Sequence, residues 1–344
     1  MLISVQALRA LAAWTVVCHH FMQIFFDFQA SSALGQLFID KGAVGVDVFF
    51  VISGLVIFLS TENKDLAPGR FLMYRLFRIV PAYWLYTLLM GLLVVFAPPA
   101  FADQSVDGWH LLLSLLFIPT QNPGGYGIYP TLNVGWTLNY EMLFYLLFAW
   151  TLLFRLHLRL LIVAALLFAV SQAWTGFGWV SDFYRSDIVY EFLLGMGLGM
   201  LYRRGWIKPG LWLPLLMIGG ALLTLYQLPP QPRVLAWGLP SALIVAASMA
   251  LERYFQHNRL LKVLGDSSYS VYLMHVLVLS LGGYAAQRYG LNPYAVFAGC
   301  VLVIGLAAWG SYEWVEKRSY QWLKRWADAT GTASAAQALT RQKP

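Results

Sequence analysis

The chain has 344 residues and a formal net charge of +7; 59% of its residues are hydrophobic and only 11% are charged. Soluble domains usually carry about 25% charged residues, so the charged side chains are too few to cover a soluble globular protein, and the high hydrophobicity excludes disorder. The apolar runs are long and continuous, which predicts an all-α, polytopic integral membrane protein rather than a β-barrel.

Ten apolar segments approach the ~20 residues that a transmembrane helix needs. In chain order, we expect membrane spans at about residues 5–27, 42–60, 77–97, 134–153, 157–175, 187–203, 211–227, 235–252, 267–286 and 294–316. A shorter apolar stretch, residues 109–119, fits an interfacial helix, a re-entrant helix or an eleventh partial span.

The distribution of lysine and arginine predicts the orientation. If the N-terminus is cytoplasmic, nearly all of these residues outside the spans fall on the cytoplasmic side, and only Lys41, Arg185, Arg233 and Arg288 fall on the other. This asymmetry predicts that both termini are cytoplasmic, and it explains the positive charge without a nucleic-acid partner. We expect a transmembrane domain over residues 1–325 and a disordered cytoplasmic tail over residues 326–344.

Ionisable residues inside the spans are costly and are therefore functional candidates. Arg9 and His20 are eleven residues apart, which places them about 20° apart around one helix and ~16 Å apart along it. His19 faces elsewhere. Asp47 and Glu141 enter the membrane from the outside to a depth close to that of His20, so we expect the three in one layer, where a carboxylate raises the basicity of an imidazole. Snorkelling, helix-end and packing roles are the structural alternatives.

Arg75 and Arg78 are three residues apart and therefore share a helical face. Paired guanidinium groups suit phosphate, although anchoring at the inner membrane surface is an alternative. Arg9 lies in the same inner layer. The sequence thus predicts an inner phosphate site and an outer base site ~16 Å apart, about the reach of the pantetheine arm of coenzyme A.

This arrangement suggests a reaction. His20 would act as a general base and deprotonate an acceptor hydroxyl, which attacks a thioester carbonyl. Asn139, Ser53 or a backbone N–H would stabilise the oxyanion. We expect no metal site, because His19 and His20 face apart and no cysteine pair accompanies them.

These residues resemble the acyltransferase-3 family of bacterial integral-membrane acyltransferases. The motifs that carry the resemblance are QALRALAAWTVVCHH with Arg9 and His20, GVDVFFVISG at residues 45–54, FLMYRLFRIVPAYW with Arg75 and Arg78, WTLNYEMLFY with Glu141, SYSVYLMH with His275 and SYEWVEKR with Glu316. Together they cover nearly the whole chain, and the QALRA opening most resembles the exopolysaccharide-modifying branch. The family often has Glu-x-Pro at the last motif, whereas Arg318 occupies the proline position here.

The resemblance implies a ten-helix core in the bacterial inner membrane. It implies transfer of an acyl group, usually acetyl, from acetyl-CoA or another cytoplasmic acyl-CoA to a hydroxyl of a cell-envelope or exported polysaccharide, or of its lipid-linked precursor, in the company of polysaccharide biosynthesis proteins. It also implies functional roles for His20, Arg9, Arg75 and Arg78, with Glu316 less securely. His275 fits either a supporting role or a structural hydrogen bond beneath the site.

Two other functions fit the same residues. A transporter or flippase of a polysaccharide precursor would use the buried charges as a proton or substrate path. No internal repeat supports it, although the glycine-rich stretch 192–200 is compatible with it. A non-catalytic component of a polysaccharide assembly machine would tolerate loss of Arg75 and Arg78.

Overall fold

The computed structural model describes residues 2–62, 66–229 and 231–341, and side chains up to residue 329. All regular secondary structure in this part is helical, as predicted. The α-helices are α1 (Ile3–Phe26), α2 (Ala33–Lys41), α3 (Val44–Thr61), α4 (Pro68–Phe96), α5 (Gly108–Leu115), α6 (Trp136–Thr151), α7 (Leu156–Phe168), α8 (Glu191–Arg203), α9 (Trp212–Gln227), α10 (Leu239–Ala250), α11 (Arg259–Asp266), α12 (Ser268–Tyr289), α13 (Pro293–Ser311) and α14 (Arg318–Arg341). Three π-helical segments extend or join them: η3 (Ala169–Trp174) after α7, η6 (Val234–Gly238) before α10 and η8 (Tyr312–Lys317) between α13 and α14.

Each of the ten predicted spans coincides with a helix. The largest difference is α4, which begins at Pro68 rather than at residue 77, because proline is well tolerated in the first helical turn. Five of the described helical segments are long and apolar enough to cross a membrane by length and composition. The total of ten spans and the cytoplasmic location of both termini remain predictions.

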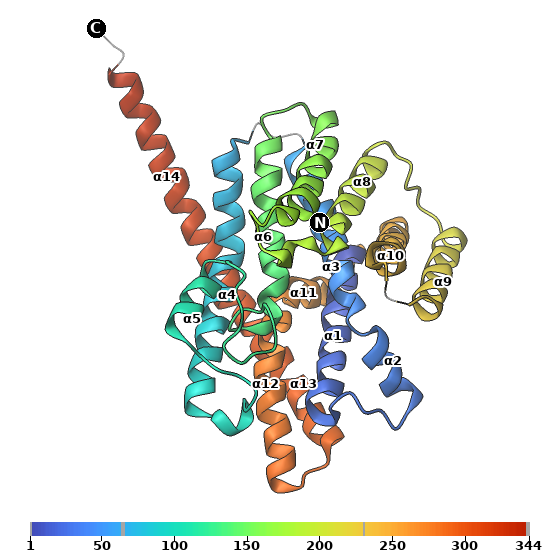
Figure 1. Cartoon of the computed structure of the whole chain (residues 1–344). Helices are drawn as coiled ribbons and strands as arrows, with labels where there is room; N and C mark the ends of the chain where they lie inside the picture. The colour runs from blue at the N-terminus through green and yellow to red at the C-terminus, as the bar shows by residue number, and fades with distance from the viewer. Residues whose placement is uncertain (1, 63–65, 230, 342–344) are drawn as a thin grey trace.

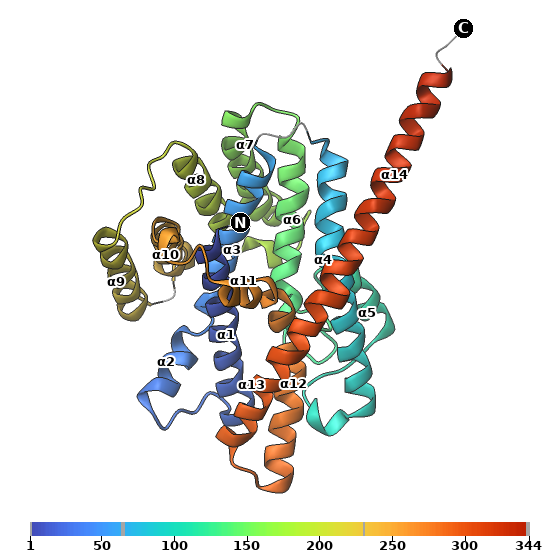
Figure 2. The ribbon, with the colours of Figure 1, turned by 180° about the vertical axis from the view of Figure 1, so that it is seen from behind.

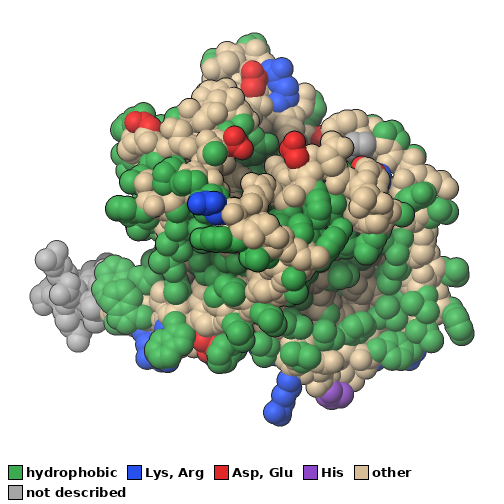
Figure 3. Space-filling model, turned by 90° about the horizontal axis from the view of Figure 1, so that it is seen from below, with side chains coloured by type: hydrophobic (Ala, Val, Ile, Leu, Met, Phe, Trp, Pro, Cys, Tyr) green, Lys and Arg blue, Asp and Glu red, His purple; other side chains and the backbone are tan. Residues whose placement is uncertain are grey.

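The surface of the bundle is rich in apolar side chains. Leu92 and Phe96 of α4, Leu216 of α9 and Leu306 of α13 are each more than half exposed. Such surfaces are unusual in soluble monomers and fit contact with lipid. Figure 3 shows the end of the molecule that holds the α1–α2, α4–α5 and α12–α13 connections, and few charged side chains lie on it.

Helix α1 packs against α3, α11 and α12 (Figures 1 and 2). Helix α3 crosses α8 at very short range: a Cβ atom at Gly54 would lie 2.0 Å from the Phe192 carbonyl oxygen, and one at Gly195 would lie 1.9 Å from the Val51 carbonyl oxygen. Small residues allow such close helix approach in membranes. Part of the glycine-rich stretch on α8 therefore serves packing.

A side chain from a distant part of the chain caps the start of α1. Glu252 accepts hydrogen bonds from the backbone N–H groups of Ile3 at 2.9 Å and Ser4 at 2.8 Å, so it satisfies two N–H groups that a helix start leaves free. Helix α11, which follows Glu252 in the chain and was not expected from the sequence, runs across the bundle beside α1 (Figure 2).

Two peripheral helices bear on the sequence predictions. Helix α5 begins one residue before the apolar stretch 109–119 and, with eight residues, is only ~12 Å long, too short to span a membrane. Helix α14 projects from the bundle and continues to Arg341 (Figure 1), where we expected a disordered tail from residue 326. Alanine, glutamine and arginine favour a helix there. Residues 342–344 lie outside the described part, and the division at residue 325 remains a prediction.

Candidate active site

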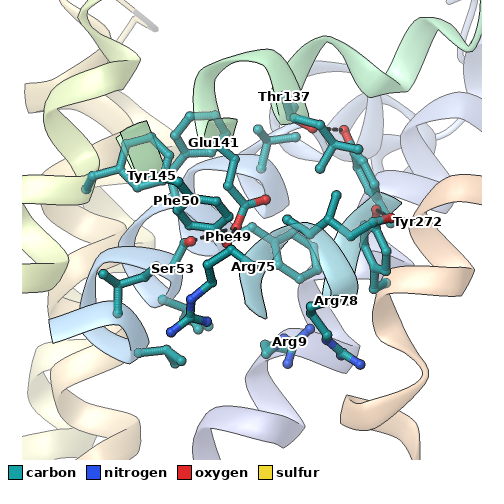
Figure 4. Close-up of a pocket in the computed structure, with 18 residues that line it drawn as sticks. Arg9, Phe49, Phe50, Ser53, Arg75, Arg78, Thr137, Glu141, Tyr145 and Tyr272 are labelled. Carbon is teal, nitrogen blue, oxygen red and sulfur yellow. Dashed lines mark hydrogen bonds between the residues drawn. The ribbon is translucent and has the colours of Figure 1, made fainter. Parts of the chain in front are cut away.

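A cavity of about 170 Å³ lies among α1, α3, α4, α6 and α12 (Figure 4). Its polar lining comes from residues that are far apart in the sequence: Arg9, Ser53, Arg75, Arg78, Thr137, Glu141, Tyr145, Tyr269 and Tyr272. The structure therefore brings together the three predicted phosphate-binding arginines, one predicted carboxylate and one predicted hydroxyl. We call this space the arginine cavity.

Arg75 is held in place by its neighbours. Its Nη2 donates a hydrogen bond to Ser60 Oγ at 2.7 Å, and its guanidinium carbon lies 5.3 Å from the centre of the Phe71 ring and 5.8 Å from that of the Tyr145 ring. Phe71 precedes Arg75 by one turn of α4, which makes the two side chains neighbours. A guanidinium has five N–H donors, so most of them remain for a ligand.

The other two arginines have different partners. Arg78 Nη1 lies 3.0 Å from Glu316 Oε2, and the buried Glu316 also accepts a 2.6 Å hydrogen bond from Ser270. Glu316 belongs to η8, which continues directly into α14, so the chain remains helical past Arg318. Arg9 donates to Gln6 Oε1 at 3.3 Å.

Glu141 lies on the opposite side of the cavity from the arginines (Figure 4). Its Oε1 accepts a hydrogen bond from Ser53 at 2.8 Å and a second from Tyr145. Among the ion pairs of the described residues, none involves Glu141, Arg9 or Arg75. The carboxylate and these two guanidinium groups therefore line one cavity without direct pairing.

Asp47 does not line this cavity. It is fully buried and accepts two 2.8 Å hydrogen bonds from Arg233, one at each carboxylate oxygen. The lining positions of α3 follow a helical stripe that includes Val46, Phe49 and Ser53, and Asp47 lies off this stripe. It shares the face that carries Val51 and Gly54 against α8. The side chains of Asp47 and Glu141 are therefore bonded to Arg233 and to Ser53 and Tyr145, and the expected contact of a carboxylate with His20 is not seen among the described residues, where His20 Nδ1 meets Gln23 instead.

His20 lies beside His275. The centres of the two rings are 5.0 Å apart, and their planes are inclined by 44°. His20 Nδ1 lies 2.7 Å from Gln23 Oε1. His275 is fully buried and donates from Nδ1 to the Tyr272 carbonyl at 2.7 Å, while its Nε2 has no hydrogen-bond partner among the described residues. His19 faces another direction, with Nδ1 2.9 Å from the Phe38 carbonyl oxygen.

Ring contacts connect the arginine cavity with the histidine pair. Phe49 and Tyr272 both line the cavity, and their ring centres are 5.9 Å apart. The Tyr272 ring centre is 5.8 Å from that of His275, which contacts His20. The Tyr272 hydroxyl donates to the Val134 carbonyl at 2.9 Å and is therefore fixed. His20 and His275 do not line the cavity, and this series of packed rings is what connects them with it.

The predicted oxyanion donors receive no support from their positions. Ser53 already donates to Glu141, and Asn139 is buried outside the cavity lining.

Sequence reasoning missed two tyrosines of the cavity lining, Tyr145 and Tyr272. Tyr145 follows Glu141 by four residues and Tyr272 precedes His275 by three, and both spacings make the side chains neighbours on a helix. In the described part of the chain, no group of three or more His, Cys, Asp and Glu side chains is placed to hold a metal ion.

Comparisons with known proteins identify the family. The acyltransferase-3 profile, described as an acyltransferase domain, matches residues 2–312. The chain is 36% identical over 299 residues to the exopolysaccharide production protein ExoZ of Rhizobium meliloti (strain 1021), covering 82% of this chain and 91% of ExoZ. It is 29% identical over 351 residues to the acyltransferase MdmB of Streptomyces mycarofaciens, covering 89% of this chain and 88% of MdmB. No solved structure shows significant similarity to this chain. The chain therefore belongs to the acyltransferase-3 family and is a multi-pass membrane acyltransferase.

Proposed function

We propose that the protein transfers an acyl group, most often acetyl, from acyl-CoA to a hydroxyl of an exported or cell-envelope polysaccharide or of its lipid-linked precursor. The family supports acyl transfer, and the name of the relative ExoZ supports a polysaccharide acceptor. In this proposal the protein lies in the bacterial inner membrane with ten spans, both termini are cytoplasmic, and the transmembrane domain over residues 1–325 performs the reaction.

The observation that carries the proposal is the meeting of Arg9, Arg75 and Arg78 at one cavity. Guanidinium groups bind phosphate oxygens with paired, charge-assisted hydrogen bonds. Sites for drug-sized ligands usually measure about 300–1,000 Å³, whereas this cavity measures about 170 Å³. It would therefore hold a phosphate-bearing part of coenzyme A, and the rest of the donor would extend beyond it.

His20 acts at the other end of the donor. Arg9 and His20 are separated by ~16 Å along α1, so an extended pantetheine arm that passes Phe49 and Tyr272 brings its thioester to the imidazole. His20 takes the proton of the acceptor hydroxyl as its oxygen bonds to the thioester carbonyl carbon. The carbon–sulfur bond then breaks, the thiolate leaves with its electron pair, and the proton passes from His20 to the thiolate. His275 positions the His20 ring through the direct contact between the two rings.

Binding of acetyl-CoA tests the donor site. A ligand that binds the folded state raises the melting temperature, so millimolar acetyl-CoA should raise that of the purified protein in detergent. The shift should be lost in Arg75→Ala/Arg78→Ala and kept in Arg185→Ala, which removes a surface arginine that forms an ion pair with the exposed Asp182. Absence of a shift in a cooperatively melting wild-type protein would contradict the acyl-CoA donor and favour a transporter.

A further inference from the structure

Glu141 is an unusual group to find in a phosphate-binding cavity. Its negative charge would repel a phosphate, yet it lines the same space as three arginines. A carboxylate inside a membrane protein normally pairs with a nearby cation. Within the described part of the chain, Glu141 has no lysine or arginine nitrogen within 4 Å.

Hydrogen bonds hold this carboxylate in position. Ser53 and Tyr145 both donate to Oε1, so Oε2 remains for a group inside the cavity. An ionised carboxylate only accepts hydrogen bonds. The cavity therefore has a side with N–H donors, formed by the arginines, and an opposite side with a charged acceptor (Figure 4). A ligand that satisfies both sides carries an anionic group and a hydrogen-bond donor.

The position of Glu141 along α6 indicates which part of the ligand it meets. Tyr145, one turn further along α6, lies beside Arg75. Thr137 lies one turn before Glu141, and its hydroxyl is 3.0 Å from the Tyr272 hydroxyl. The Tyr272 ring in turn contacts the His275 ring. Glu141 therefore lies between the arginines and the histidine pair, where the arm of the donor has to pass.

We propose that Glu141 accepts a hydrogen bond from an amide N–H of the pantetheine arm and thereby selects an amide-bearing thioester over a simple phosphate anion. This inference rests on the proposed function, because it assumes a coenzyme A thioester as donor. It makes Glu141 a specificity-determining residue for the donor.

Two substitutions and two ligands test the inference in the full-length protein in detergent. In Glu141→Ala, coenzyme A should bind about tenfold more weakly, because a hydrogen bond to a charged acceptor is lost. Inorganic pyrophosphate should instead bind several-fold more tightly, because a repelling charge is removed. Glu141→Gln keeps an acceptor without the charge, so it should bind coenzyme A within about threefold of wild type and pyrophosphate more tightly.

Controls separate this inference from the proposed function. Arg185→Ala removes an exposed charge outside the cavity lining, so the affinities for coenzyme A and for pyrophosphate should both stay unchanged. Adenosine 3′,5′-bisphosphate lacks the arm and should behave like pyrophosphate; weaker binding in Glu141→Ala would overturn the assignment to the arm. If both coenzyme A and pyrophosphate bind more tightly to Glu141→Ala, the inference fails while the arginine site stands. If wild type binds neither ligand, the proposed function fails as well.

Discussion

Two groups of buried charge differ in how a carboxylate meets an arginine. In the first group, Asp47 and Arg233 form two direct 2.8 Å hydrogen bonds, and Asp187 accepts a 3.1 Å bond from the backbone N–H of Val234, next to Arg233. In the arginine cavity, Glu141, Arg9 and Arg75 line one space, and no ion pair of the described residues joins the carboxylate to either guanidinium group.

The difference separates a structural role from a binding role. Direct pairing at Asp47 joins the start of α3 to Arg233, which directly precedes η6 and lies 186 residues later in the chain, and it places the guanidinium group on both carboxylate oxygens. In the arginine cavity, Glu141, Arg9 and Arg75 are bonded to neutral side chains and keep further donors and acceptors for a ligand. We therefore expect substitutions at Asp47 to affect folding and substitutions around the arginine cavity and the histidine pair to affect activity.

The largest expected effect on activity is at His20. His20→Ala should lower acyl transfer by about 10²–10⁴-fold, the range that a general base contributes, while the ligand-free melting temperature changes little because the His20 side chain is only partly buried. Transfer of radiolabelled acetyl from acetyl-CoA to extracted polysaccharide measures it. The adjacent His19→Ala is the matched control and should stay active. Full activity in a well-expressed His20→Ala protein would refute the assigned base.

Breaking the Asp47–Arg233 pair should give the largest loss of stability. Asp47→Ala leaves a guanidinium without its buried partner, and we expect the free energy of unfolding to fall by about 3–5 kcal/mol. Thermal melting in detergent measures the loss. Removing both charges in Asp47→Leu/Arg233→Met should cost much less. A normal melting temperature combined with lost acyl transfer in Asp47→Ala would instead place Asp47 in the chemistry.

Arg75 and Arg78 sharpen the comparison, because among the described residues Arg78 has a carboxylate partner and Arg75 has none. Arg75→Gln should weaken acetyl-CoA binding by about tenfold or more, since charge-assisted hydrogen bonds contribute about 1.5–3 kcal/mol, and the ligand-free protein should melt normally. Arg78→Gln should weaken binding and also lower the melting temperature, because the buried Glu316 loses its ion pair. Titration calorimetry and thermal melting distinguish the two; equal melting behaviour would contradict a structural role for Arg78–Glu316.

The smallest effect should come from a pair that is direct but exposed. Arg185 and Asp182 are 2.9 Å apart, with side-chain exposures of 55% and 73%. Arg185→Ala should change the free energy of unfolding by no more than about 1 kcal/mol, because water already solvates both charges. Acyl transfer should be unchanged. A large loss of stability would show that direct pairing matters here regardless of burial.

Much of the fold was predictable because hydrophobicity acts locally. Each of the ten predicted apolar runs became a helix, and the neighbour spacing of Arg75 and Arg78 placed both at one cavity. Helix α11 was missed because it is short and is stabilised by packing against α1. The interaction of Asp47 with Arg233 was missed because helix depth says nothing about which face of one helix meets another.

The sequence by itself determined the helical membrane character, the positions of the apolar runs and the common face of Arg9 and His20, because composition and helical periodicity are properties of short segments. Only the tertiary structure decided the pairing of these groups. It directed Asp47 to Arg233, Arg78 to Glu316 and His20 to His275. It placed Glu141 in the same cavity as the arginines with hydrogen bonds to Ser53 and Tyr145, and with no ion pair among the described residues. The physical reason is that each choice depends on how distant helices cross, which is set by side-chain packing over the whole molecule.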